Sequence, residues 1–128
     1  MKYKKSTIVL VAFIVIVVFF LNKGEVNGED DTGEYDTFAK CLEDSGAKFY
    51  GAYWCSHCNN QKDMFGASAK KIPYIECSLP NRAGQTSICA QAEINGYPTW
   101  EFPDGSRQSG SLSLNVLAER SGCDLVKD

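Results

Sequence analysis

Positive charge is scarce in this chain once its first 23 residues are set aside. The 128 residues carry 13 basic and 16 acidic side chains, and residues 1–23 hold four of the basic ones and none of the acidic ones. The remainder therefore has nine basic and 16 acidic residues, a formal charge of −7. Because nucleic-acid binding depends on basic surfaces, we expect no nucleic-acid partner.

Histidine is rarer still. His57 is the only one, and it lies between two of the six cysteines in the stretch YWCSHCNNQ, residues 53–61. A Cys-x-x-Cys-His haem attachment site is excluded, because Asn59 follows the second cysteine of the pair. The pair, Cys55 and Cys58, could be a redox centre, half of a zinc site or a structural crosslink.

A zinc site would need Cys77 and Cys89 as its other two ligands, and the gap between these two is too long for a zinc knuckle. The redox alternative is favoured because an aromatic strand precedes the pair and a helix follows it. We expect neither a metal nor an organic cofactor.

The N-terminal region has no charged residue from position 6 to position 22, and residues 8–21 are wholly apolar. Three lysines precede this run, so residues 1–23 are predicted to be a signal anchor or a cleaved signal peptide. The lysines keep the N-terminus inside by the positive-inside rule. We therefore expect a domain anchored to the membrane on its extracytoplasmic side, or secreted if the signal is cleaved.

Residues 24–35 are polar and acidic with no basic residue, which predicts a flexible stalk. Residues 36–128 are enough for one small domain with a modest core, and they show no internal repeat.

Helical and extended patterns alternate along this domain. Asp36 and Ser113 are placed to cap the first and last helices, and Gly46 and Gly122 to end them. The predicted elements are a helix from 36, a strand 48–54, a helix to about 71, a strand 73–77, a helix 85–94 with Ile88 and Ala92 inward, strands 99–102 and 107–109, and a helix from 113. This order predicts an α/β sandwich with a hairpin at one edge of the sheet.

The cysteine pair falls where a strand ends and a helix begins. A thiol at a helix N-terminus is stabilised as thiolate by the helix dipole and the free amide groups. Cys55 is therefore the predicted nucleophile, and Cys58, one turn later, is the resolving thiol. His57, when protonated, would stabilise the thiolate further and make the disulfide a stronger oxidant.

The motif YWCSHC, with GYPTW placing Pro98 43 residues after Cys55, looks like the thioredoxin superfamily. More narrowly, KFYGAYWCSHCNNQKDMFG, IPYIECS and GYPTWEF resemble the thioredoxin-like domain that accompanies bacterial and plant homologues of vitamin K epoxide reductase. The likeness runs from about Phe38 to Gly122. It implies a thioredoxin-like fold, with a central mixed sheet flanked by helices and a cis-proline loop at Pro98.

This resemblance implies an exported thiol-disulfide oxidoreductase that oxidises cysteines of other exported proteins. In that family a membrane-embedded, quinone-reducing module is commonly fused to the domain, so we expect a module of that kind as the redox partner. A disulfide reductase or isomerase is the nearest alternative, and a non-catalytic binding module of the same fold is a further one.

The resemblance also suggests individual roles. Tyr97 and Pro98 would hold the substrate chain beside Cys55, and Trp54 is retained as a candidate substrate contact although packing is its favoured role. Two positions depart from the pattern: Ser56 replaces a usual proline, and Phe49 stands where thioredoxin has a buried acid. The second departure weakens the case for an efficient general reductase.

Four cysteines lie outside the pair. The resemblance has a second cysteine pair in the region of Cys77 and Cys89, which we expect to form a structural disulfide. Cys41 and Cys123 belong to the first helix and to the segment after the last one. In a thioredoxin fold these helices cover opposite faces of the sheet, so free or intermolecular thiols are favoured over a bond between the two, and their pairing stays open.

Overall fold

The computed structural model describes residues 5–21 and 32–128, in two units that are considered separately. The first unit contains α1 (Lys5–Leu21), which corresponds to the predicted signal segment. Within the described ranges, no helix is both long enough and apolar enough to cross a membrane. Most of the predicted stalk, residues 24–31, lies outside the described residues.

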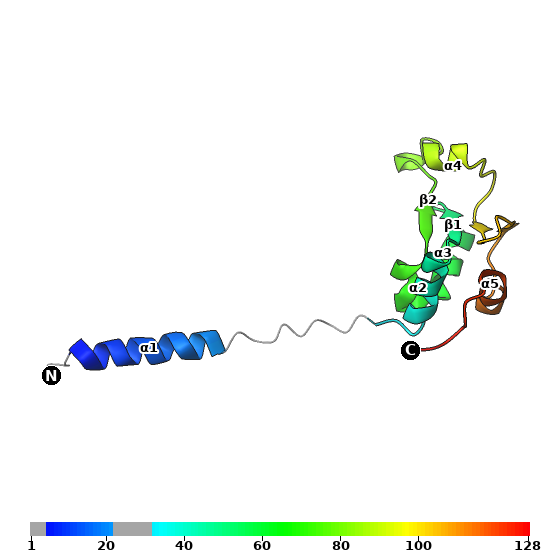
Figure 1. The fold of residues 1–128 in the computed structure, drawn as a ribbon. Coiled ribbons are helices and arrows are strands. Elements are labelled where there is room, and N and C mark those ends of the chain that lie inside the picture. Colours follow the sequence, from blue (N-terminus) through cyan, green and yellow to red (C-terminus); the bar gives the residue numbers. More distant parts are fainter. Residues whose placement is uncertain (1–4, 22–31) are drawn as a thin grey trace. The chain divides into compact units, whose positions relative to one another are not determined.

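The second unit is an α/β domain (Figure 1). Its elements are α2 (Asp36–Asp44), β1 (Lys48–Gly51), α3 (Ser56–Asp63), η1 (Gly66–Lys71), β2 (Tyr74–Glu76), η2 (Pro80–Arg82), α4 (Ser87–Gln91), β3 (Thr99–Glu101), β4 (Arg107–Ser109) and α5 (Leu114–Ser121). The capping predictions hold for α5, because the Ser113 side chain accepts from Val116 N and Gly122 ends the helix at φ +76°. Asp36 was predicted to cap the first helix, but it is the first residue of α2, and Tyr35 is the N-cap.

The sheet has the order β2-β1-β3-β4. β1 pairs in parallel with β2 and antiparallel with β3, and β3 pairs antiparallel with β4. This mixed sheet with flanking helices confirms the predicted fold class.

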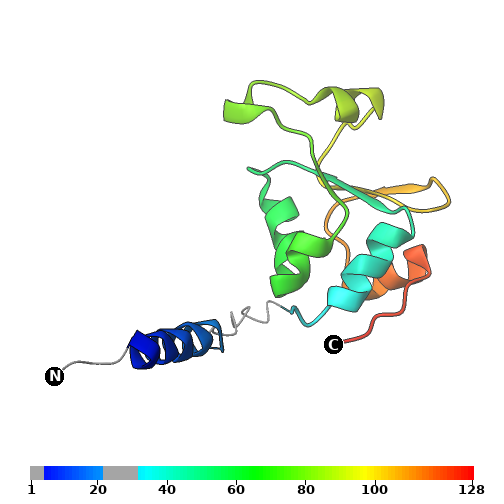
Figure 2. The ribbon, with the colours of Figure 1, turned by 60° about the vertical axis from the view of Figure 1, so that its left-hand side comes forward.

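The two faces of the sheet are covered differently (Figure 2). Phe49 and Trp100 are opposite each other in the register, so they point to the same face, and both belong to the main core with side chains of α2, α3 and α5. Tyr50 points to the other face, where a smaller cluster joins it to Cys77, Cys89 and Ile94. The helices α2, α3 and α5 therefore share one face of the sheet.

This arrangement corrects the prediction for Cys41 and Cys123. The two cysteines form a disulfide, with an S–S distance of 2.06 Å and Cα atoms 5.9 Å apart. The expectation of free or intermolecular thiols was wrong because α2 and α5 do not lie on opposite faces, and the chain after α5 returns to α2.

The domain also begins earlier than predicted. The backbone N–H of Tyr35 donates to Ser68 Oγ at 2.9 Å, and Asp128 N donates to the carbonyl of Glu34 at the same distance. Gly33 is buried, and a Cβ there would collide with Ser68. Residues 33–35, assigned to the stalk from their acidity, are thus packed on the domain.

The helix predicted for residues 85–94 is shorter in the structure. α4 ends at Gln91, and Glu93 has a left-handed backbone with φ +56°. Ile88, predicted to point inward, is 53% exposed, whereas Cys89 is fully buried. The disulfide to Cys77 therefore replaces a hydrophobic helix face as the means of holding this segment.

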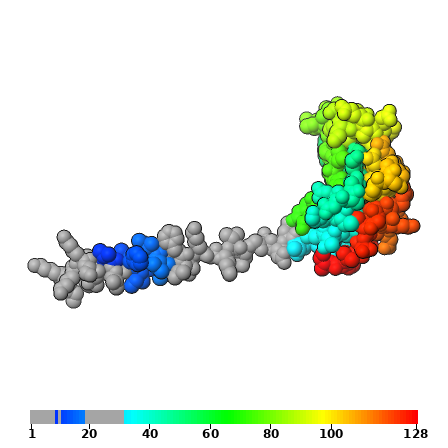
Figure 3. Space-filling model, viewed as in Figure 1, coloured from blue at the N-terminus to red at the C-terminus, as the bar shows by residue number. Residues whose placement is uncertain are grey.

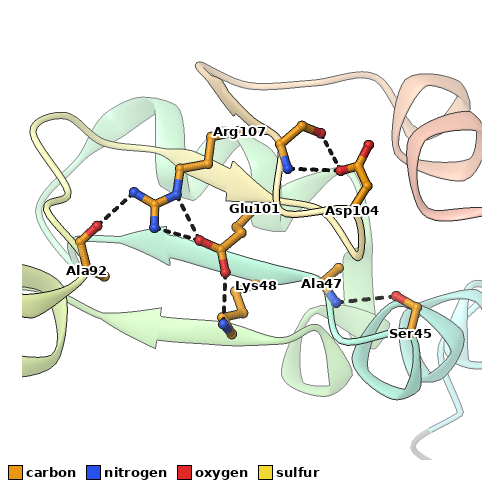
Figure 4. A network of polar contacts seen from close by, with 8 residues as sticks. Ser45, Ala47, Lys48, Ala92, Glu101, Asp104 and Arg107 are labelled. Carbon is orange, nitrogen blue, oxygen red and sulfur yellow. Dashed lines mark hydrogen bonds and ion pairs between the residues drawn. The ribbon is translucent and has the colours of Figure 1, made fainter.

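Residues 79–94, called the arm below, lie on the face of the sheet away from the three helices (Figure 2), and they form the top of the domain in the view of Figure 3. Figure 4 shows how the C-terminal end of the arm is held. Arg107 donates to the Ala92 carbonyl at 2.7 Å and pairs with Glu101, which also pairs with Lys48. One edge network thus ties the arm to β1, β3 and β4.

Candidate redox site

The cysteine pair opens α3. Cys55 is the N-cap, with an extended backbone (φ −81°, ψ 116°), and its Sγ accepts the backbone N–H of Cys58 at 3.2 Å. Both side chains are free thiols; Cys55 is 8% exposed and Cys58 is fully buried. A sulfur that replaces the usual capping oxygen sits among the first amides of the helix, where negative charge is stabilised. The geometry matches the predicted order, with Cys55 outermost.

The thiol of Cys58 lies in a tight apolar setting at the end of β1. A Cβ on Gly51 would be only 3.2 Å from Cys58 Sγ and 2.7 Å from Cε2 of Tyr74, so only glycine leaves room for both groups. Burial, followed by the hydrogen bond with Cys55, raises the pKa of Cys58 to about 12. Cys58 is therefore a neutral thiol at pH 7 unless another group favours its thiolate.

Phe49, where the resemblance to thioredoxin would place a buried acid, lies on β1. Its ring is fully buried, stacks on Trp100 with centroids 4.8 Å apart, and meets Tyr74 edge to face at 5.2 Å. Trp100 is thus a packing residue. The aromatic stack belongs to the same apolar cluster as Cys55 and Cys58.

A carboxylate missed by the sequence interpretation organises the loop before Cys55. Glu76 Oε1 accepts the backbone N–H groups of Tyr53 at 3.2 Å and Ser78 at 2.8 Å, and Oε2 accepts from the Tyr74 hydroxyl at 2.7 Å. The hydrogen bond to Glu76 and burial both keep the pKa of Tyr74 above its ordinary value, burial being the larger cause. The sequence YIE, residues 74–76, contained a signal for this contact, because Tyr74 and Glu76 are two residues apart and so share one side of the strand.

A second missed residue is Gln61, which is fully buried on α3. Its side chain donates to the Leu112 carbonyl at 3.0 Å and accepts from Leu112 N at 2.7 Å and Trp100 Nε1 at 3.1 Å. These bonds fix α3 to β3 and to the segment before α5. Only its place on the inward side of the helix, three residues after Cys58, distinguishes it in the sequence.

Trp54 connects the pair to the arm. Its indole Nε1 donates to Ser78 Oγ at 2.8 Å, the Arg82 guanidinium lies 5.1 Å from the ring centre, and Tyr97 meets it edge to face at 6.1 Å. The ring is nevertheless 40% exposed. Trp54 therefore both packs and presents surface beside Cys55.

The Tyr97–Pro98 peptide bond is cis, and Pro98 is buried. The Pro98 carbonyl accepts from Gly110 N at 2.9 Å, and the Tyr97 hydroxyl accepts from Gln85 of the arm at 2.8 Å. Pro98 has no backbone N–H, and its carbonyl is already bonded.

The remaining predicted site residues fall into two groups. His57 is exposed on the first turn of α3, where its carbonyl accepts from Ser111 Oγ at 2.7 Å.

Cys77 and Cys89 form a disulfide with an S–S distance of 2.00 Å. The zinc alternative required both of these sulfurs as ligands, and their mutual bond removes them.

The chain matches no protein-family profile. It is 47% identical over 91 residues to thiol-disulfide oxidoreductase LTO1 of Arabidopsis thaliana, covering 68% of this chain and 24% of the relative. It is 35% identical over 92 residues to a thioredoxin domain-containing protein 5 homolog of Drosophila melanogaster, covering 64% and 22%. The chain thus spans about a quarter of the length of the curated relatives it matches. Fold and relatives together support a thioredoxin-like domain.

Proposed function

We propose that this domain is a thiol-disulfide oxidoreductase in which Cys55 exchanges disulfides with a substrate and Cys58 resolves the mixed disulfide. One observation carries the proposal: two free thiols open a helix, the outer one as its N-cap and the inner one buried a turn later. One relative is a thiol-disulfide oxidoreductase and the other a thioredoxin domain-containing protein, and both support this proposal.

The domain is further proposed to act as an oxidase for cysteines of exported proteins. The helix terminus at Cys55 and the neighbouring His57 favour the reduced, thiolate form, and this makes the disulfide a stronger oxidant. The apolar Phe49, in the same core cluster as the pair, weakens the case for an efficient reductase, because in that direction the resolving thiol must first lose its proton and Phe49 offers no base. Reductase or isomerase activity, and a non-catalytic binding module, remain the competing functions.

The setting of the reaction is also a proposal. The domain would belong to the type that accompanies vitamin K epoxide reductase homologues and would pass electrons to a membrane-embedded, quinone-linked module. Its apolar N-terminal segment would hold it at the membrane, on the extracytoplasmic side. Tyr97, beside the buried Pro98, would pair with an extended substrate segment, and Trp54 would contact it.

Trapping of substrates tests the roles of the two thiols. Cys58→Ala is expected to accumulate mixed disulfides through Cys55 in the exported fraction, because the first exchange proceeds and the release does not. Cys55→Ala is the matched control and should trap few or none. Equal trapping by both variants would overturn the assignment, and absence of trapping by either would favour the binding module.

A further inference from the structure

The surroundings of Cys58 disfavour a negative charge on its sulfur. In either direction of electron flow Cys58 must carry a thiolate, yet its thiol is fully buried and Phe49 offers no polar group. A buried anion without a counter-charge is strongly disfavoured. A neighbouring positive charge would reduce this cost.

Lys62 is placed to do so. It lies four residues after Cys58 on α3, so the two side chains occupy the same face of the helix. Its ammonium Nζ sits 3.4 Å from the centre of the Tyr74 ring, a cation–π contact that holds it inward. The side chain is half-buried, as this contact requires.

The Tyr74 ring in turn flanks the thiol. The contacts of a Cβ built on Gly51, 2.7 Å to Tyr74 Cε2 and 3.2 Å to Cys58 Sγ, show that ring and sulfur meet at this glycine. Glu76 anchors the ring through its hydroxyl at 2.7 Å. The ammonium is thus fixed on the aromatic group that borders the buried sulfur.

We propose that Lys62 stabilises the thiolate of Cys58 and thereby speeds the step in which the Cys55–Cys58 bond breaks or forms. This inference rests on the proposed function. When a substrate thiolate attacks Cys55, the Cys55–Cys58 bond breaks and Cys58 leaves as a thiolate. In reverse, the Cys58 thiolate attacks Cys55 of the mixed disulfide, the intramolecular bond forms, and the substrate leaves as a thiolate.

Two further observations support this role. Burial is the largest influence on the pKa of Cys58 and raises it; a backbone hydrogen bond at Ala52 and, more weakly, the charge of Lys62 lower the pKa. The other ionisable groups around this thiol are Cys55 at the helix start and Tyr74 on β2, with Glu76 behind the Tyr74 hydroxyl. A surface groove lined by Lys62, Ala69, Lys70, Ile72 and Tyr74 gives water access to the ammonium.

The test uses the full chain in mild detergent, with Cys55 and Cys58 as free thiols and the other two disulfides intact. Rapid mixing with 5,5′-dithiobis(2-nitrobenzoate) separates attack by Cys55 from displacement by Cys58. Attack by Cys55 releases one coloured thiolate at a rate proportional to reagent concentration. Displacement by Cys58 releases a second thiolate in a phase independent of reagent. The other four cysteines are in disulfides and do not contribute.

Lys62→Met is expected to slow the second phase about three- to tenfold at neutral pH and to move its midpoint to higher pH, by up to roughly one unit. The first phase should not change. Lys62→Arg should restore the second phase. Lys70→Met is the matched control, since it removes a charge from the same groove, and it should have the smaller effect.

The outcomes distinguish this inference from the function on which it rests. A normal second phase in Lys62→Met, or an equal loss in Lys70→Met, overturns the role of Lys62 alone. If the wild type shows no second phase, so that it matches Cys58→Ala, the resolving role of Cys58 fails and the inference fails with it. Slowing that Lys62→Arg does not restore contradicts a role for the charge.

Discussion

Cys123 is 5% exposed and Cys55 is 8% exposed, yet the first is locked in a disulfide and the second is a free thiol. Burial therefore does not separate the structural from the proposed reactive cysteines. Cys41 and Cys123 join α2 to the segment after α5, where the first and last segments of the domain are tied together. Cys55 instead caps a helix, with its partner a turn away. What distinguishes the two regions is their backbone setting and nearby charge.

The region around Cys41 and Cys123, called the clasp below, is closed by several contacts of the C-terminal segment. Lys127 pairs with Glu34, and Asp128 accepts the backbone N–H of Thr37 at 2.8 Å at the start of α2. These contacts supply a capping group from the far end of the chain, since Tyr35 at the N-cap makes no side-chain cap bond. The clasp therefore holds the fold closed, whereas the redox end leaves both of its thiols free.

The largest expected effect is on stability at the clasp. Removing both Cys41 and Cys123 by alanine substitution opens a loop with a sequence separation of 82 residues. In the chain-entropy model this lowers the free energy of unfolding by about 4.5 kcal/mol. Denaturant unfolding measures the loss. Under native conditions Cys55 should react as fast in this variant as in the wild type. If the variant folds but its Cys55 no longer reacts, the two regions are not independent.

Removing Cys77 and Cys89 together should cost less, about 3 kcal/mol, because the sequence separation is only 12 residues. This change should nevertheless reach the redox end. The arm supplies contacts to Trp54 and Tyr97, so loosening it should reduce the rate of mixed-disulfide formation by Cys55. Amide hydrogen exchange in residues 79–94 reports the loosening. Unchanged exchange and unchanged reactivity would show that the arm is held by other means.

Gln61→Leu should destabilise the domain by about 2 kcal/mol, because it leaves buried groups of Leu112 and Trp100 without partners. Thermal and denaturant unfolding measure the effect. Asn60→Ala, on the exposed side of the same helix, is the control and should change stability little. Equal effects of the two substitutions would mean that the Gln61 bonds contribute nothing.

The smallest expected effect is on the stability of the domain at low pH. The hydrogen bond from Lys48, and then that from Arg107, holds the pKa of Glu101 below its ordinary value. A lowered pKa in the folded state stabilises the domain above the unfolded pKa, and this stability is lost as pH falls through the folded value. The melting temperature should therefore decline below about pH 4. Glu101→Gln should flatten this decline, whereas Glu119→Gln on α5 should not.

The local sequence was informative where the backbone pattern decides the structure. Cys55 at the start of α3, the strand around Phe49, and the helix stops at Gly46 and Gly122 all follow from short motifs and periodicity. The positions of sulfurs distant in sequence did not follow in the same way. The Cys41–Cys123 bond depends on α2 and α5 sharing one face of the sheet, which no local pattern encodes.

Two site features were missed for a related reason. Glu76 and Gln61 are polar residues whose roles come from partners brought close only by folding, at Tyr53 and at Leu112 respectively. The exposure of Ile88 was mispredicted because a disulfide, rather than an apolar helix face, fixes the arm. Sequence periodicity reports the core well and hydrogen bonds between elements poorly.

A redox titration of the full chain in graded glutathione buffers, followed by alkylation and peptide mapping, tests the division between the two regions directly. We expect Cys55 and Cys58 to interconvert together at about −180 to −120 mV, while the other four cysteines stay protected throughout. A potential for the pair near −270 mV, the value of thioredoxin, would contradict the oxidising role. Exchange of the Cys41–Cys123 bond over the same range would contradict the division itself.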